Sequence, residues 1–519
     1  MDRIERETQY TLGCPELRFS LDVAGMKFTD GQLDEMLPAL KSAYAGMKAI
    51  EAGEIKNPDE NRKVTHFTDR IEYSQSELFA AVKNFADGIA QGKILSASGK
   101  KFTQAVINGI GGSALGPQLM QFAINGPYWN ELSEAKRRGY LKIYFLDNTD
   151  PAGIADLEKV LDPETALAVT ISKSGGTQET QNNLNALESL FDEAGVDLPR
   201  QSAVITMRGS KLWKYAESRN YLRIFEMAES IGGRTSETSV VGHLPAALAG
   251  IDFAEFLRGA CKMDAWTRID DFESNPAYLL AAMWYIAGNG RGDRNMVIVP
   301  YSDRLVLLSR YLQQLVMESL GKEKDLDGNT VNQGLNVFGN KGGTDAHAFI
   351  QQLNDGRDDF FVTFIEVLKD AANLDMGGDM AMGDYLHGFL EGLSAALQSK
   401  GRQVIRITID ELNPAALGML IALYERAVAV YAELIHINAF HQPGVQAYKL
   451  AAKDVLAFRA KLFDNLAKLA PVQGSAAELA ERAGCGSDPV LAAGLLNKAA
   501  VNGEIDREFR DLQWIYRVK

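Results

Sequence analysis

The residues best suited to chemistry stand in the stretch Ile171–Thr180, which reads Ile-Ser-Lys-Ser-Gly-Gly-Thr-Gln-Glu-Thr. It follows the apolar, strand-like run Ala166–Ile171 and precedes a helix-like segment that begins at about Thr177. A helix start offers unpaired backbone N–H groups and a positive dipole end, and glycines let the backbone close around an anion. The hydroxyls of Ser172, Ser174 and Thr177 would add donors. The stretch predicts a phosphate-binding loop; the alternative is an ordinary strand-to-helix turn with a Ser/Thr cap.

A second glycine-rich loop, Gly109–Pro117, follows another apolar run, Ala105–Asn108. It superficially suggests a dinucleotide loop, but Ala114 fills the position of the last glycine and no acidic ribose partner is evident, so NAD binding is disfavoured. Ligands of parallel α/β sheets bind at the carboxyl ends of strands, where both loops fall. We therefore expect the two loops to lie side by side.

The elements that must position these loops are short apolar strands that alternate with helical segments. Such alternation is typical of a mostly parallel, doubly wound α/β sheet, and the chain has two sets of it. The further strand-like runs are Leu141–Leu146, Ser202–Met207, Leu222–Glu226, Met296–Pro300, Leu335–Phe338, Phe360–Ile365 and Val404–Ile409. The expected fold class is α/β, with two doubly wound parallel-sheet domains.

The domain organisation follows from the length of 519 residues, which is too long for one ordinary core. We predict an N-terminal helical segment at residues 1–60, a large α/β domain at 61–260 and a small one at 290–465. After the linker Ala470–Ser475, residues 475–519 would form a small C-terminal appendage of two helices and a hairpin-like tail. This appendage is winged-helix-like but lacks a basic stripe, which disfavours DNA binding.

Composition narrows the class of partner. A formal net charge of −14 disfavours nucleic acid, and no stretch of about 20 residues is uniformly apolar, so no membrane span is expected. The three cysteines are far apart and odd in number, which favours a reducing, cytoplasmic location over a disulfide framework. The histidines form no metal-binding triad by spacing, so we predict no metal and no cofactor.

Four further motifs carry a family resemblance. They are Gly232-Gly233-Arg234, Met317–Lys322, Gly343–Phe349 and His441–Lys449. The loops resemble phosphosugar isomerase (SIS) domains, and the separated motifs occur in the order of the phosphoglucose isomerase family over roughly residues 60–465. The resemblance is to its bacterial and cyanobacterial branch more than to the animal one. It implies two SIS-type domains and reversible isomerisation of glucose 6-phosphate and fructose 6-phosphate through an enediol(ate), in glycolysis and gluconeogenesis.

The resemblance also implies the catalytic roles. Glu318 would be the base that moves a proton between C1 and C2, and His347 would act as acid and base on the ring oxygen. Lys449 would assist ring opening at the C1 hydroxyl, and Arg234 would stabilise the enediolate. Without the motifs, each would be an ordinary solvated or structural side chain. In the family the histidine comes from the neighbouring subunit, so a homodimer with shared active sites is implied.

The substrate-binding residues implied by the same matches are Gly112, Ser113, Ser172, Lys173, Ser174, Thr177, Gln314 and Gln442. The chain departs from the family at Gly176, where another threonine is usual, and at Thr235-Ser236-Glu237, where an aromatic residue followed by serine is common. These departures bear on affinity and specificity. Two alternatives stay open: a phosphosugar-sensing SIS protein without catalysis, and an isomerase that also accepts mannose 6-phosphate.

Overall fold

The structure, a computed structural model, describes residues 3–519 and divides into two compact units, Met1–His441 and Gln442–Lys519. The first unit contains two large sheets with helices on both faces of each. The second contains three helices and a small sheet. The α/β class and the parallel sheets expected from the sequence are confirmed.

The first sheet has five strands in the order β4-β3-β5-β6-β7, and all neighbouring pairs are parallel. The strands are β3 (Gln104–Asn108), β4 (Lys142–Leu146), β5 (Ala166–Ile171), β6 (Ser202–Thr206) and β7 (Arg223–Glu226). Every residue of β3, β5 and β6 is buried, because helices cover both faces. This burial explains why these strands read as continuous apolar runs in the sequence.

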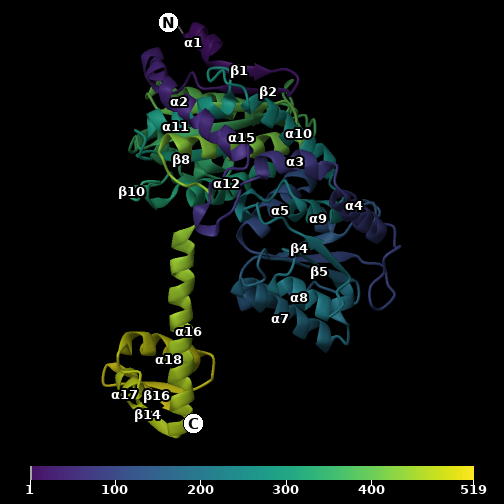
Figure 1. Cartoon of the computed structure of the whole chain (residues 1–519), viewed down its shortest axis with the longest axis vertical. Helices are drawn as coiled ribbons and strands as arrows, with labels where there is room; N and C mark the ends of the chain where they lie inside the picture. Colours follow the sequence, from purple (N-terminus) through teal and green to yellow (C-terminus); the bar gives the residue numbers. More distant parts are fainter. Residues whose placement is uncertain (1–2) are drawn as a thin grey trace. The chain divides into compact units, whose positions relative to one another are not determined.

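Helices pack on both faces of the first sheet (Figure 1). One face carries α6 (Pro151–Glu158), α7 (Gln178–Glu193) and α8 (Lys211–Ser218), whose apolar residues pack with Val106 and Val204. The other face carries α4 (Glu77–Ala90), α5 (Leu115–Met120) and α9 (Val240–Leu248). The strand order reverses between β3 and β5, which makes the carboxyl ends of these two strands the expected ligand site.

The second sheet has the order β1-β2-β13-β12-β8-β11, in which the last four strands are mutually parallel. They are β8 (Asn295–Pro300), β11 (Val337–Phe338), β12 (Phe360–Val367) and β13 (Gln403–Ile409). The N-terminal segment, predicted as helical, adds β1 (Thr11–Cys14) and β2 (Phe19–Asp22), with β2 antiparallel to β13. The prediction missed these strands because their burial depends on β13, which lies almost 400 residues away in sequence.

Helices also cover both faces of the second sheet. The larger apolar layer is made by α2 (Asp30–Glu51), α10 (Phe253–Thr267), α11 (Pro276–Ala287) and α15 (Pro414–Leu434). The opposite face is covered by α13 (Ile350–Asp355) and α14 (Met382–Ser399). The remaining elements of the first unit are α1 (Arg3–Tyr10), α3 (His66–Ser74), α12 (Leu308–Leu312), β9 (Lys322–Lys324) and β10 (Thr330–Gln333), together with short turns.

Helix α15 is long and apolar enough to cross a membrane by length and composition alone. Within its most apolar window, however, 94% of the residues are buried inside the protein. It packs against α10 and α11 at the centre of the larger core cluster. Its apolar character is therefore that of a core helix.

The second unit is built on α16 (Pro443–Leu469), α17 (Ala476–Arg482) and α18 (Pro489–Val501). Its antiparallel sheet has the order β14-β16-β15, from β14 (Val472–Ser475), β15 (Asp506–Arg510) and β16 (Gln513–Val518). Ser475 and Glu478 form the capping box that opens α17. Helix α16 lies in this unit, although the sequence placed most of it in the small α/β domain.

Candidate active site

The two glycine-rich loops follow β3 and β5, which are hydrogen-bonded neighbours. After β3 the chain makes the 3-10 turn η2 (Gly111–Ser113), and after β5 it makes the loop Ser172–Thr177 before α7. Both loops therefore stand at the carboxyl edge of the first sheet, at the point where the strand order reverses. This placement is the one expected of a ligand site in a doubly wound sheet.

Two serine side chains of the loop Ser172–Thr177 form hydrogen bonds with the backbone of the same loop. The Oγ atom of Ser172 accepts a hydrogen bond from the backbone N–H of Gly175 at 3.1 Å, and Oγ of Ser174 accepts one from Gly176 at 3.1 Å. Thr177 stands at the N-cap of α7, yet no side-chain capping hydrogen bond is made there. Because a mere cap would use this hydroxyl for the helix, the geometry favours an anion-binding loop over the ordinary cap.

Lys173 ties this loop to the neighbouring segment. Its Nζ donates to the backbone oxygens of Glu229 at 2.5 Å and Ile231 at 3.2 Å, just before the Gly232–Arg234 motif. Burial, assisted by the nearby Arg62 guanidinium, lowers the pKa of Lys173 to about 8. Lys173 thus links the proposed phosphate loop to the segment that carries Arg234.

Gly175 and Gly176 provide a matched pair that tests the loop. Gly175 has a φ of +67°, and a Cβ there would lie 2.3 Å from the backbone nitrogen of Leu212, whereas a Cβ at Gly176 meets only Oγ of Ser174 at 3.4 Å. We expect Gly175→Ala to raise the KM for a phosphorylated sugar by about tenfold or more, since misplaced donors lose charge-assisted hydrogen bonds. Gly176→Ala should change KM by less than about threefold, and steady-state kinetics on both variants measures the difference. Equal KM values would mean that this loop does not bind the phosphate.

The other glycine loop packs directly against the segment of Arg234. A Cβ at Gly112 would lie 1.9 Å from the backbone oxygen of Gly233 and 2.7 Å from the nitrogen of Arg234, so only glycine fits there. Ser113 ends the same turn and is half-buried. This close approach brings Gly112, Ser113 and Arg234 into one site.

Glu318 lies at the end of a π-helical turn. The sequence predicts one helical run up to this residue, but α12 stops at Leu312 and the chain widens into the π turn η8 (Gln313–Glu318). Such turns are frequent at functional sites, because they shift side chains out of the regular helical register. Here Nε2 of Gln314 donates to Oε2 of Glu318 at 3.0 Å.

The side-chain oxygen of Gln314 lacks a hydrogen-bond donor within the described structure. Its Oε1 is buried and accepts no hydrogen bond from any residue in the described range 3–519. Its amide also lies beside the glycine loop, since a Cβ at Gly111 would be 2.9 Å from Nε2 of Gln314. A buried acceptor without a donor is costly, so a water molecule or a bound ligand is expected to donate to this oxygen.

Arg234 is buried on the 3-10 turn η6 (Gly233–Thr235) and contacts the Glu318 carboxylate. Its Nη1 donates to Oε1 of Glu318 at 3.0 Å, and its Nε donates to Oγ of Ser319 at 2.7 Å. Nη2 donates to the backbone oxygen of Ala439 and, at 3.3 Å, to that of His441. Burial lowers the pKa of Arg234, and the Glu318 carboxylate opposes this effect.

Lys322 is a residue of this site that the sequence did not single out. Its Nζ donates to the backbone oxygens of Glu318 at 2.7 Å and Ser319 at 2.8 Å. Burial and the Arg234 guanidinium lower the pKa of Lys322 to about 7. In the sequence it appears only as the last residue of the motif Met317–Lys322, one helical turn after Glu318 and without an assigned role.

A small cavity of about 20 Å³ lies behind Arg234, lined among others by His66, Ser319 and Glu425. Both ring nitrogens of His66 are buried without a hydrogen-bond partner among the described residues. The cavity has room for about one water, which would satisfy the ring. Burial holds the pKa of His66 well below its ordinary value, so the imidazole is neutral.

The remaining site residues lie apart from this cluster in the chain. His347 ends the 3-10 turn η9 (Thr344–His347) and is exposed. The turn is fixed by buried Asp345, which accepts bonds from the N–H of Asn340 at 2.9 Å and of Lys341 at 3.1 Å. Gln442 stands at the N-cap of α16 and Lys449 is exposed on that helix, both in the second unit.

Comparisons with known proteins identify the family of the chain. The family model described as phosphoglucose isomerase matches residues 30–386 and 391–461. A glucose-6-phosphate isomerase of Cyanothece sp. is 45% identical over 502 residues, 94% of this chain and 93% of that protein. One from Geobacter sp. is 47% identical over 467 residues, 87% of this chain and 86% of its own.

Structural comparison gives the same result. The crystal structure of a glucose-6-phosphate isomerase from Chlamydia trachomatis is similar with a TM-score of 0.77 at 27% identity. The similarity covers 87% of this chain and 90% of that one. Together with the fold and the ordered motifs, these matches establish that the chain belongs to the phosphoglucose isomerase family.

Proposed function

We propose that this protein interconverts glucose 6-phosphate and fructose 6-phosphate, as an intramolecular aldose–ketose isomerase of glycolysis and gluconeogenesis. The observation that carries the proposal is the cluster of Glu318, Arg234 and Gln314, which lies against the glycine loop at the carboxyl edge of the first sheet. The cluster combines a carboxylate that would act as the base, a buried guanidinium and a side-chain oxygen that lacks a hydrogen-bond donor among the described residues. The free Cys14, Cys261 and Cys485 favour a reducing compartment, and we propose the cytoplasm.

The loop Ser172–Thr177 would hold the phosphate through its backbone N–H groups and hydroxyls, while Gly112 and Ser113 flank the sugar. Anchoring the phosphate positions C1 and C2 of the open-chain sugar against Glu318. Lys173 would act by holding this loop in place rather than by chemistry.

The carboxylate of Glu318 would take the proton from C2 of the aldose. The C2–H electron pair would form the C1–C2 double bond, and the carbonyl oxygen on C1 would become an oxyanion. The guanidinium of Arg234 would stabilise that oxyanion, because it carries its charge in a water-excluded position before the reaction begins. Return of the proton from Glu318 to C1, with transfer of the hydroxyl proton from O2 to O1, gives the ketose. Gln314 would accept a bond from a substrate hydroxyl and keep the base oriented.

Ring opening precedes this proton transfer. His347 would protonate the ring oxygen as the C1 hydroxyl loses its proton, and Lys449 would assist at that hydroxyl. Gln442, at the start of the helix that carries Lys449, would contact the phosphate end of the substrate. The exposed position of His347 supports a role at a surface that a second subunit completes.

We further propose a homodimer in which His347 of one subunit serves the Glu318 of the other. Mixing the inactive Glu318→Gln and His347→Ala proteins and allowing subunits to exchange is expected to restore about a quarter of the wild-type activity. Half of the dimers are then hybrids, and each hybrid has one intact active site and one inactive one. Coupled kinetics during the exchange measures this recovery. If exchange occurs, as shown by mass spectrometry of differently tagged subunits, and no activity returns, the sites are not shared.

A further inference from the structure

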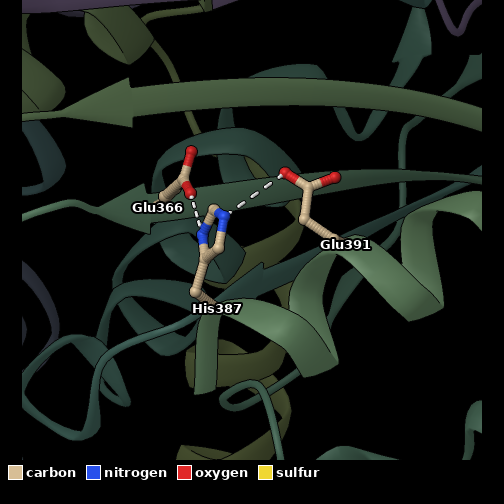
Figure 2. A group of neighbouring side chains, drawn as sticks. All are labelled: Glu366, His387 and Glu391. Atoms are coloured by element: carbon tan, nitrogen blue, oxygen red, sulfur yellow. Dashed lines mark ion pairs between the residues drawn. The ribbon is translucent and has the colours of Figure 1, made fainter. Parts of the chain in front are cut away.

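A second cluster of chemically competent side chains lies on the second sheet. Figure 2 shows His387 between two carboxylates, Glu366 from strand β12 and Glu391 from helix α14. The Nδ1 atom of His387 is 2.9 Å from Oε1 of Glu366, and Nε2 is 4.0 Å from Oε1 of Glu391. One nitrogen or oxygen from each residue lies within 4.8 Å of the others. None of these residues takes part in the proposed isomerisation.

The three residues differ in burial in a way that suits an ion entering from solvent. The side chain of Glu366 is 7% exposed, whereas that of His387 is 55% exposed and that of Glu391 is 42% exposed. His387 and Glu391 are four residues apart on α14 and so face the same side of the helix. The buried carboxylate, that of Glu366, comes from strand β12, whereas His387 and Glu391 lie at the protein surface.

One oxygen of the buried carboxylate, Oε1, makes no hydrogen bond of normal geometry with the described residues, and its neighbour is the imidazole of His387. Oε2 of Glu366 accepts a bond from Oγ1 of Thr408 at 2.9 Å, but Oε1 accepts none from the residues in the described part of the chain. The imidazole is close to Oε1 but does not make a hydrogen bond of normal geometry with it. A buried carboxylate oxygen needs a cationic partner, which is either the protonated imidazole of His387, 2.9 Å away, or a bound metal ion.

Neighbouring side chains hold the two carboxylates in place. Thr408 on β13 fixes Glu366 from one side. Arg406, on the same strand, donates to both oxygens of Glu391 at 2.5 and 2.9 Å. Outer contacts of this kind orient metal ligands, and the guanidinium offsets part of the negative charge.

We propose that Glu366, His387 and Glu391 form a binding site for a divalent transition-metal ion, with Zn²⁺ as the best-suited ion. An imidazole with two carboxylates favours such ions over Mg²⁺ and Ca²⁺, which prefer oxygen ligands alone. Zn²⁺ holds such ligands at about 2.0–2.2 Å, so the exposed His387 and Glu391 would turn toward Glu366 on binding, and water would complete the coordination. The ion would clamp α14 to the sheet and play no part in proton transfer.

Titration calorimetry with ZnCl₂ on protein freed of metal by chelator and exchanged into buffer tests the site. Wild-type protein is expected to bind one equivalent of Zn²⁺, and His387→Ala and Glu366→Gln are each expected to weaken binding by at least about tenfold. His436→Ala is the matched control, since His436 is also surface-exposed, at 56%, and pairs with Asp327 at 3.1 Å elsewhere. Far-ultraviolet circular dichroism of each variant checks that it is folded.

Zinc-edge anomalous diffraction from crystals soaked in ZnCl₂ locates the ion independently. A peak between Glu366, His387 and Glu391, with unchanged binding in His436→Ala, supports the site. The proposal is overturned if wild-type protein binds no Zn²⁺, if folded His387→Ala retains full affinity, or if the peak lies only at the cysteines or His436.

Discussion

Replacing Glu318 by glutamine is expected to lower kcat for conversion of fructose 6-phosphate by about 10²–10⁴-fold and to leave the Kd for the phosphosugar within about threefold. Glutamine has the shape of glutamate, and its amide oxygen keeps the bond that Oε1 accepts from Arg234 at 3.0 Å. Its NH2 group takes the place of Oε2, which accepts from Gln314 at 3.0 Å, and donates to Gln314 once that amide turns over. It cannot take a proton from carbon at neutral pH. The loss should therefore appear in turnover rather than in binding.

Stopped-flow or coupled kinetics gives kcat, and calorimetry with a non-isomerisable phosphosugar alcohol gives Kd. The matched control is Glu323→Gln, which removes an exposed carboxylate five residues further along the chain and should retain full turnover. Near-normal turnover in Glu318→Gln would remove Glu318 from the role of base.

Replacing Arg70 by methionine is expected to destabilise the protein by about 3–5 kcal/mol near neutral pH. Arg70 is fully buried between Asp264 at 3.1 Å and Glu425 at 2.8 Å. Arg426 extends this network to Glu51, and together these residues join α3, α10, α15 and α2 behind the active-site cavity. Without the Arg70 guanidinium, Asp264 and Glu425 remain as two buried carboxyl groups. Each must either carry its negative charge in the protein interior without this partner or bind a proton.

The same variant has an expected pH dependence. Burial raises the pKa of Glu425 to about 7 in the folded wild type, above its ordinary value of 4.5, and Arg70 opposes that rise. A carboxyl with a raised folded pKa contributes stability below its unfolded pKa and loses it as the pH increases through the folded pKa. Without Arg70 that pKa rises further, so the destabilisation should grow between pH 5 and pH 8.

Urea unfolding of wild type and Arg70→Met at these two pH values measures the effect. Arg258→Met is the matched control on α10, since the Arg258 side chain is 62% exposed and pairs with Glu255 at 3.4 Å; its cost should stay below about 1 kcal/mol. A destabilisation of Arg70→Met no larger than that of the control would show that the buried network contributes nothing to stability.

The sequence predicted the parallel strands of both sheets because they read as apolar runs. Strand β5 followed by Ser172–Thr177 is the clearest case, since a continuous apolar run, a hydroxyl- and glycine-rich loop and a helix start are all local signals. The positions of Gly112 and Arg234 came from motif matches. Their contact is a tertiary fact, visible only from the 1.9 Å approach that a Cβ at Gly112 would make to Gly233.

Other features could not be predicted because no local pattern encodes them. Strand β2 pairs with β13, which is distant in sequence, and β1 pairs only with β2. The π turn at Gln313–Glu318 has the apolar spacing of an ordinary helix, so only its hydrogen bonding distinguishes it. Lys322 and the Arg70 network read as solvated charges until the fold buries them.

The most direct test of the proposed function is the addition of purified protein to fructose 6-phosphate in the presence of EDTA, with glucose 6-phosphate detected by a coupled dehydrogenase. Rapid conversion that EDTA does not slow is expected, because the proposed base, acid and oxyanion-stabilising cation are all side chains of the protein. Binding of fructose 6-phosphate without formation of glucose 6-phosphate would contradict the proposed function and would favour a phosphosugar sensor.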